Sequence, residues 1–253
     1  MPNSPLQNRG MAVLVMLATI AVIAVNYLAA TGHINGVMPN EISDKYPTVI
    51  TPAGWAFSIW SLIYTGLIGF SIYQLLPSRV AEFTRVRLPY IVSCVLNISW
   101  ILLWHHFHVG ICGVVIALFL VSLMWVNFTL DPPATSGANI LTKGVFGLYA
   151  GWVTAATLVN FVISIVSLGI QWSGVAWSVV GILCLGTGLA AAILVRVSLG
   201  NFIYPLPIAW AAAAIGANQS GKNTAMVIAS AILCIACLIV SGTIVTELKG
   251  SPA

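Results

Sequence analysis

The chain has 253 residues, of which 60% are hydrophobic and 6% are charged, and its mean hydropathy is +1.03. Soluble domains carry charge on roughly a quarter of their residues, so nine Lys and Arg with five Asp and Glu are too few for a water-facing surface. The composition excludes a soluble enzyme, and it excludes a disordered chain, which needs low hydrophobicity and high charge. It predicts an integral membrane protein.

Apolar runs of about 20 residues, the length that crosses a bilayer core of roughly 30 Å, recur along the chain. They predict an all-α fold, a polytopic integral membrane helix bundle with about eight spans. Pro205 and Pro207 open the seventh run and remove backbone donors, so an alternative with seven spans, in which this segment is re-entrant, stays open. The predicted spans are residues 11–30, 54–76, 88–104, 110–130, 141–168, 174–195, 202–217 and 224–245.

Basic residues give the expected orientation. With eight spans, seven of them fall on one face and two on the other, an asymmetry that places both termini in the cytoplasm of a multi-pass protein of the cell membrane. The net charge of +4 does not indicate nucleic acid, because the basic residues are spread singly between apolar runs. The larger group is Arg9, Arg79, Arg85, Arg87, Lys143, Arg196 and Lys249, and the smaller group is Lys45 and Lys222.

The longest outward loop, residues 31–52, mixes polar residues with apolar ones. Loops of this length usually have a role of their own, so we expect this loop to fold over the bundle as a lid. The alternative is a plain connector between the first two spans. Its apolar residues include Ile34, Val37, Ile42, Tyr46 and Val49.

Aromatic side chains recur at helical spacing in three spans. Trp60 and Tyr64 are one turn apart and share a helix face, Trp100 lies in the third span, and Trp152 is one turn from the small Ala156. Flat rings beside a gap suit a flat apolar ligand such as a porphyrin. The alternative is that these rings are anchors at the membrane interfaces.

Four asparagines, Asn26, Asn97, Asn127 and Asn160, lie within or near the ends of apolar spans. An unpaired amide is costly in hydrocarbon, so we expect all four to face the bundle and to form hydrogen bonds between helices. Two of them, Asn97 and Asn160, are also candidates to line a cavity.

Catalytic machinery is not visible in the sequence. His105 and His108 are one helical turn apart, and either could serve as an axial ligand to haem iron or as part of a metal site. Because no carboxylate lies nearby in the sequence, we instead expect these histidines to be polar residues at the membrane interface. The five cysteines all fall in apolar runs, where cysteine behaves as a small hydrophobe. We therefore expect no enzyme activity, no catalytic residue, no metal and no cofactor.

Motifs in three spans, taken in chain order, resemble the TspO/MBR family of tryptophan-rich sensory or translocator proteins. Residues 54–64 read G-W-A-F-S-I-W-S-L-I-Y, residues 96–100 read L-N-I-S-W, residues 148–152 read L-Y-A-G-W, and residues 155–161 read A-A-T-L-V-N-F. The resemblance covers the first five spans and implies a five-helix membrane bundle over residues 1–168.

This resemblance also implies a function. A receptor, sensor or translocator would bind a hydrophobic, tetrapyrrole-like small molecule between the first, second and fifth helices, under the outward loop. The implied contacts are Trp60, Tyr64, Asn97, Trp100, Trp152, Ala156 and Asn160. Phe161 and Ile165 stand where the family has the Tyr and Arg of its sterol-associated segment, so the hydroxyl and the cation of that segment are missing.

Residues 169–253 have no counterpart in the five-helix family and form a second expected region of small-residue-rich membrane helices. Helix faces made of small residues let helices pack closely, so the helices of residues 169–253 could close the bundle or join two copies of the chain in a homodimer. Two alternatives for function follow. One is a small-solute permease that uses these helices, and the other is a signalling or scaffold component of the membrane.

Overall fold

The computed structural model describes residues 5–130, 136–170 and 172–243, and these residues form helices and no strands. The expected all-α, polytopic bundle is confirmed. Four short elements join the long helices: α2 (Pro39–Lys45), η1 (Gly54–Ser58), α6 (Ser136–Asn139) and η2 (Ile140–Gly144). The long helices are α1 (Pro5–Ala30), α3 (Ile59–Tyr73), α4 (Thr84–His105), α5 (Val109–Thr129), α7 (Val145–Ser167), α8 (Gly174–Leu199), α9 (Pro205–Gln219) and α10 (Thr224–Gly242).

Seven helical stretches of the described chain are long and apolar enough to cross a membrane, and α9 is not among them. Its 15 residues rise only about 22 Å. Ser241 at the end of α10 donates to the carbonyl of Phe202 before α9, and Asn223 after α9 donates to Ser178 near the start of α8. Helix α9 is therefore one continuous helix packed between its neighbours, and the count of seven helices able to span agrees with the seven-span alternative.

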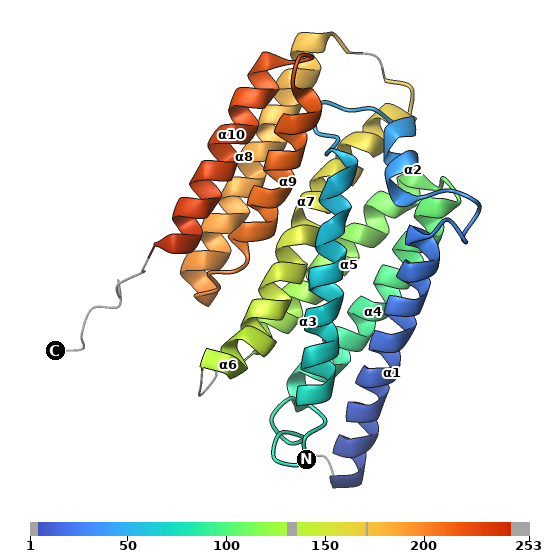
Figure 1. Cartoon of the computed structure of the whole chain (residues 1–253), viewed down its shortest axis with the longest axis vertical. Coiled ribbons are helices and arrows are strands. Elements are labelled where there is room, and N and C mark those ends of the chain that lie inside the picture. The colour runs from blue at the N-terminus through green and yellow to red at the C-terminus, as the bar shows by residue number, and fades with distance from the viewer. Residues whose placement is uncertain (1–4, 131–135, 171, 244–253) are drawn as a thin grey trace, which may run out of the picture.

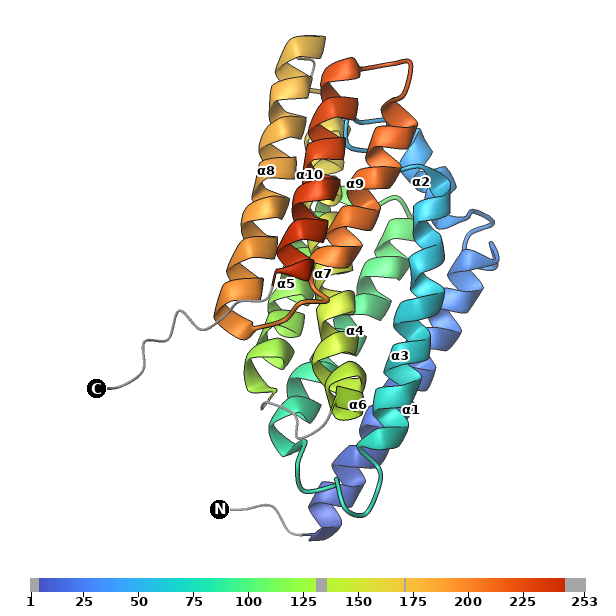
Figure 2. The same ribbon diagram turned by 60° about the vertical axis from the view of Figure 1, so that its left-hand side comes forward.

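Two glycines of α7 explain how the last three helices dock. Gly147 and Gly151 lie one turn apart, and a Cβ added at Gly151 would stand 2.2 Å from the carbonyl oxygen of Tyr204 at the start of α9. Glycines at this spacing let helix backbones approach closely in membranes. Helices α8, α9 and α10 lie side by side, with α9 against α7 (Figures 1 and 2).

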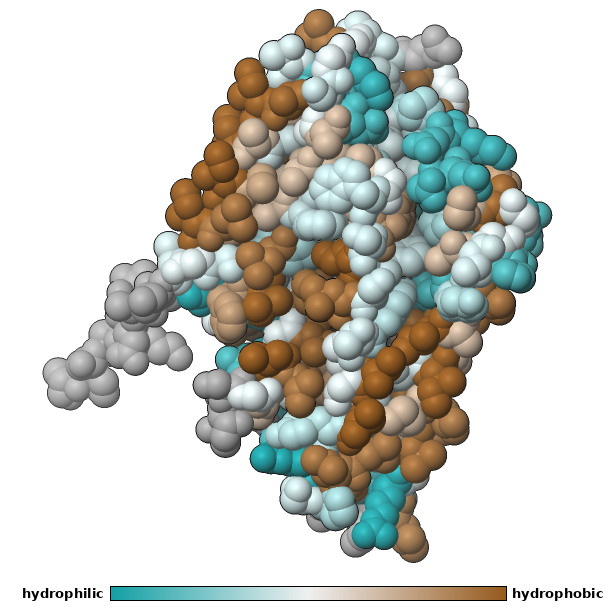
Figure 3. All heavy atoms as spheres, viewed as in Figure 1, coloured by the Kyte–Doolittle hydropathy of each residue, from teal (hydrophilic) through white to brown (hydrophobic). Residues whose placement is uncertain are grey.

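Apolar side chains cover much of the outside of the bundle. Leu62, Val121 and Ile232 are each at least 60% exposed, which a water-soluble monomer avoids over large areas. Apolar atoms follow both flanks of the molecule, while polar atoms gather over residues 31–52 near α2 (Figure 3). This distribution agrees with a bundle whose flanks face lipid.

The expectation for the four asparagines is confirmed, since all four are buried and each forms a hydrogen bond to another helix. Asn26 of α1 donates to Asn97 of α4 at 2.6 Å, and Asn97 donates to the Tyr149 hydroxyl of α7 at 2.9 Å. Asn160 accepts from the Trp100 indole. The bonds of Asn127 lead to Phe146 of α7 and to Asn201.

Replacing Asn97 with alanine is expected to lower the free energy of unfolding by about 1–2 kcal/mol, because it removes one bond to each of two helices and leaves the buried Tyr149 hydroxyl without its partner. Thermal unfolding in detergent measures the change. Ser99→Ala is the control, since Ser99 is only partly buried and bonds only to its own helix. Equal stability of the two variants would contradict a joining role for Asn97.

One basic residue that the sequence places among the loop charges is buried in the structure. Arg87 was counted with the loop charges on one face, but its side chain is buried and donates to Gln74 and to the carbonyl of Val80. The physical reason is that α4 begins at Thr84, so Arg87 lies in its first turn against the end of α3. Lys249 lies outside the described residues.

Candidate functional site

A cavity, which we call the Trp cavity, lies between α3, α4, α7 and α9 under residues 31–52. It is narrow, because only about 40 Å³ of it is open to the centre of a water-sized sphere. Ligand pockets of small molecules are mostly apolar, with a few polar groups. Its lining residues are Ser43, Pro52, Phe57, Trp60, Trp100, Trp104, Trp152, Ala155, Ala156, Val159, Asn160, Ala211 and Ile215.

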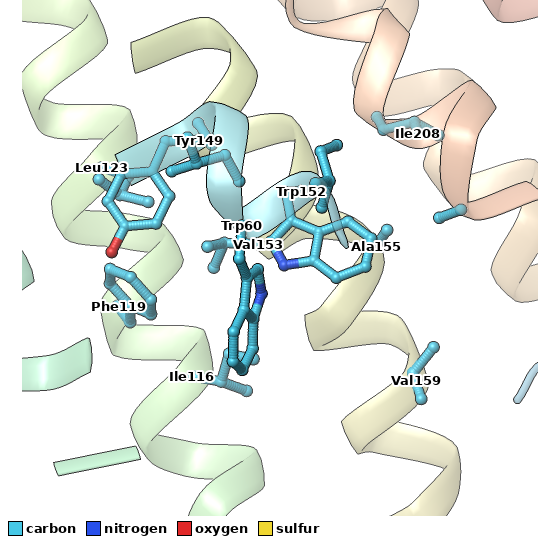
Figure 4. Close-up of a cluster of buried hydrophobic side chains, with 14 of the residues drawn as sticks. Trp60, Ile116, Phe119, Leu123, Tyr149, Trp152, Val153, Ala155, Val159 and Ile208 are labelled. Atoms are coloured by element: carbon cyan, nitrogen blue, oxygen red, sulfur yellow. The ribbon is translucent and has the colours of Figure 1, made fainter. Parts of the chain in front are cut away.

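Four tryptophans give the Trp cavity its character. Trp60 of α3 and Trp152 of α7 are 9% and 7% exposed, so they face the interior and not the membrane interface. The Phe57 ring lies edge-on to both, at 5.5 Å from Trp60 and 6.2 Å from Trp152 between ring centroids. Figure 4 shows the two indoles converging from their helices.

The indole N–H groups on the α4 side are already occupied. Trp100 donates to Asn160 Oδ1 at 3.2 Å, and Trp104 donates to the carbonyl of Pro39 at 3.2 Å. The two rings stack with centroids 5.7 Å apart and an interplanar angle of 23°. Buried indoles usually find such partners, and the result is that these two side chains offer the cavity apolar surface.

A smaller cavity, with about 20 Å³ open to the centre of a water-sized sphere, lies beside the first and shares Trp60, Trp100, Trp152 and Ala156 with it. Its remaining walls include Tyr64, Asn97 and Tyr149. The seven candidate residues from the sequence therefore all line one of these two adjoining cavities. Their contact with a ligand stays a prediction.

Residues 31–52 form the lid that their composition predicts. Ile42 and Ile50 are buried, and Asn35 donates to the carbonyl of His105 at the end of α4. Ser43 and Pro52 of this lid line the Trp cavity itself. The plain-connector alternative is wrong, because the lid packs against the bundle instead of extending from it.

The expected position between the first, second and fifth helices needs a correction. Helix α1 supplies none of the described lining residues of the Trp cavity, and α4 and α9 take its place. The physical reason is that α1 packs on the outer side of α3 and α4, where Thr19 bonds to Ser71 and Tyr90. Its polar side chains join helices there and do not reach the cavity.

Helix α9 was not expected to form part of this site. Its Ala211 and Ile215 line the Trp cavity, and its C-terminal end holds the lid, because Asn218 donates to the carbonyl of Thr51 at 2.9 Å. Trp210 donates to the carbonyl of Ala56 in η1 at 2.9 Å. The run of small residues 211–214 was the available signal, but it does not name its partner helix.

The histidines do not form a ligand set. His105 is buried and bonds to the carbonyl of Ile101, while His106 and His108 are exposed. Position 105 falls in the last turn of α4, which the lid covers. Over residues 5–130, 136–170 and 172–243, no group of three or more His, Cys, Asp or Glu could hold a metal ion.

Comparison with known proteins gives one finding. A family model described as TSPO-like protein matches residues 12–244. This match extends through the whole of α8, α9 and α10, beyond the first five spans that the motif resemblance covers. No curated protein and no solved structure matches the chain.

Proposed function

The chain belongs to the TSPO-like protein family, and we propose that it is a membrane receptor or translocator that binds a hydrophobic, tetrapyrrole-like molecule in the Trp cavity. The proposal includes a place in the cell membrane with both termini in the cytoplasm. It assigns a binding role and no catalytic step. A flat ring system is the ligand class that the lining favours.

The observation that carries this proposal is the convergence of four indoles around a space with small side chains at its edge. Ala155, Ala156 and Ala211 leave room beside the rings of Trp60 and Trp152. Aromatic faces bind a flat apolar ring by area burial and by stacking or edge-on contact. Such contacts need no charge, and the described lining residues include no charged side chain.

The carboxylates of a tetrapyrrole would be costly to bury without a partner. We therefore expect the ring system to lie among the indoles and the acidic groups to stay at the mouth of the cavity. The lid hydroxyl of Ser43 and the amide of Asn160 are the polar lining side chains. This orientation leaves the charged groups in contact with water.

Titration of the purified protein with protoporphyrin, followed by tryptophan fluorescence, tests the proposal. We expect saturable quenching and weaker binding, by about three- to tenfold, in Trp60→Phe and in Trp152→Phe, because a phenyl ring retains only part of the stacking surface. Trp125→Phe is the matched control, since Trp125 lies on the exposed side of α5.

Linear quenching without saturation, equal in all four proteins, would show that protoporphyrin only partitions into detergent. The tetrapyrrole proposal would then fail. Saturable quenching that all three variants leave unchanged would place the ligand elsewhere on the molecule.

A further inference from the structure

An apolar groove runs along the flank of the bundle between α5 and α8, with α7 as its floor. It holds about 970 Å³ of open space and is lined by Leu120, Met124 and Phe128 of α5 and by Leu194 of α8. Helix α8 packs mainly on α10 and less on α7, which leaves this side groove open. In a membrane the groove faces hydrocarbon.

A narrow middle cavity, with about 20 Å³ open to the centre of a water-sized sphere, separates the side groove from the Trp cavity. Leu158 of α7 lines both the groove and the middle cavity. On the inner side, Ala155, Val159, Ala211 and Ile215 line both the middle cavity and the Trp cavity. Figure 4 shows Ala155 and Val159 on the side of α7 that faces Ile208 of α9.

We propose that the side groove is a lateral portal, through which the hydrophobic ligand passes from the bilayer past Leu158 into the Trp cavity. This inference rests on the proposed function and adds its route of entry. A hydrophobic ring system dissolves in the bilayer and reaches the protein there at higher concentration than in water. The three spaces share walls and lead from lipid to the indoles.

Entry from water is obstructed by comparison. The lid is held to α9 by the bonds of Asn218 to Thr51 and of Gln219 to Thr48, and the backbone N–H of Ala53 donates to Ala214. Opening the lid breaks these bonds. Displacing Leu158 breaks only apolar contacts, which lipid tails replace at little cost.

Gly188 of α8 provides the site for a test. It lines the middle cavity, and a Cβ there would meet Leu158 at 3.5 Å, Ile208 at 3.6 Å and Leu233 at 3.9 Å, which is ordinary van der Waals contact. Alanine at this position fits without overlap, and leucine fills the passage. Gly186, on the exposed side of the same helix, has no neighbour within 4 Å of such a Cβ.

The experiment measures protoporphyrin binding and release by rapid-mixing tryptophan fluorescence, with the full chain in phosphatidylcholine vesicles. A plug in the route raises the barrier without changing the two end states, so Gly188→Leu is expected to slow association and dissociation by about tenfold each while the Kd changes less than about twofold. Gly188→Ala is expected to slow both by a smaller factor. Gly186→Leu is the control.

Rates in Gly188→Leu and Gly188→Ala that equal those in Gly186→Leu, with saturable binding retained, would overturn the portal and leave the proposed function intact. Loss of saturable binding in the unaltered protein would instead count against the proposed function. In that case the portal is tested by chemical labelling of Cys184, a free thiol that lines the middle cavity. Its labelling by a membrane-soluble organomercurial should be several-fold slower in Gly188→Leu than in Gly186→Leu, and equal labelling would overturn the portal.

Discussion

Replacing Gly151 with alanine is expected to lower the free energy of unfolding by about 3 kcal/mol, because the added methyl group overlaps backbone that cannot move aside. Its Cβ would stand 2.2 Å from the carbonyl oxygen of Tyr204 and 2.6 Å from Pro207. Both partners lie where the α9 backbone crosses α7. The helix must therefore shift as a whole, and its contacts with α7 are lost with it.

Thermal unfolding in detergent measures the effect, and Gly186→Ala is the matched control. Gly186 lies inside a long helix like Gly151, but a Cβ there meets nothing within 4 Å. Alanine favours helix over glycine by about 1 kcal/mol, so the control is expected to be neutral or stabilising. Equal unfolding temperatures for the two variants would contradict the close docking of α9 on α7.

The fold was predictable from the sequence because the bilayer constrains it strongly. Backbone groups in hydrocarbon must be paired within a helix, so each apolar run of sufficient length identifies a span. The same constraint placed Asn97 and Asn160 inside the bundle, because an amide has no partner in lipid. Helical spacing put Trp60 beside Tyr64 and Trp152 beside Ala156, and the structure finds these residues around adjoining cavities.

The errors concern which helices are neighbours, and hydropathy carries little information about that. Helix α1 was expected to line the site, but the hydrogen bonds of Thr19 and Asn26 hold it on the side of α3 and α4 away from the Trp cavity. Helix α9 lines the site instead. The Gly147 and Gly151 pair was visible in the sequence as a close-packing face, yet the partner that fills it, with Tyr204 at its start, is set by the connection after α8.

Filling the space beside Trp152 is the sharpest test of where the ligand lies. Ala156 is one turn from Trp152 and lines both the Trp cavity and the smaller cavity beside it. Leucine adds three carbon atoms at the point where the indoles of Trp60, Trp100 and Trp152 come together. A flat ring that occupies this space must then move away from the indoles or leave.

Ala156→Leu is accordingly expected to weaken protoporphyrin binding by about 100-fold, which corresponds to about 2.7 kcal/mol. Ala213→Leu adds the same carbon atoms on the exposed side of α9 and is expected to bind as the unaltered protein does. Added bulk in a packed interior costs about 1–3 kcal/mol of stability, so thermal unfolding must first show that Ala156→Leu is folded at the assay temperature. A folded Ala156→Leu protein with the affinity of Ala213→Leu would place the ligand outside both cavities, because no ring system can share that space with a leucine side chain.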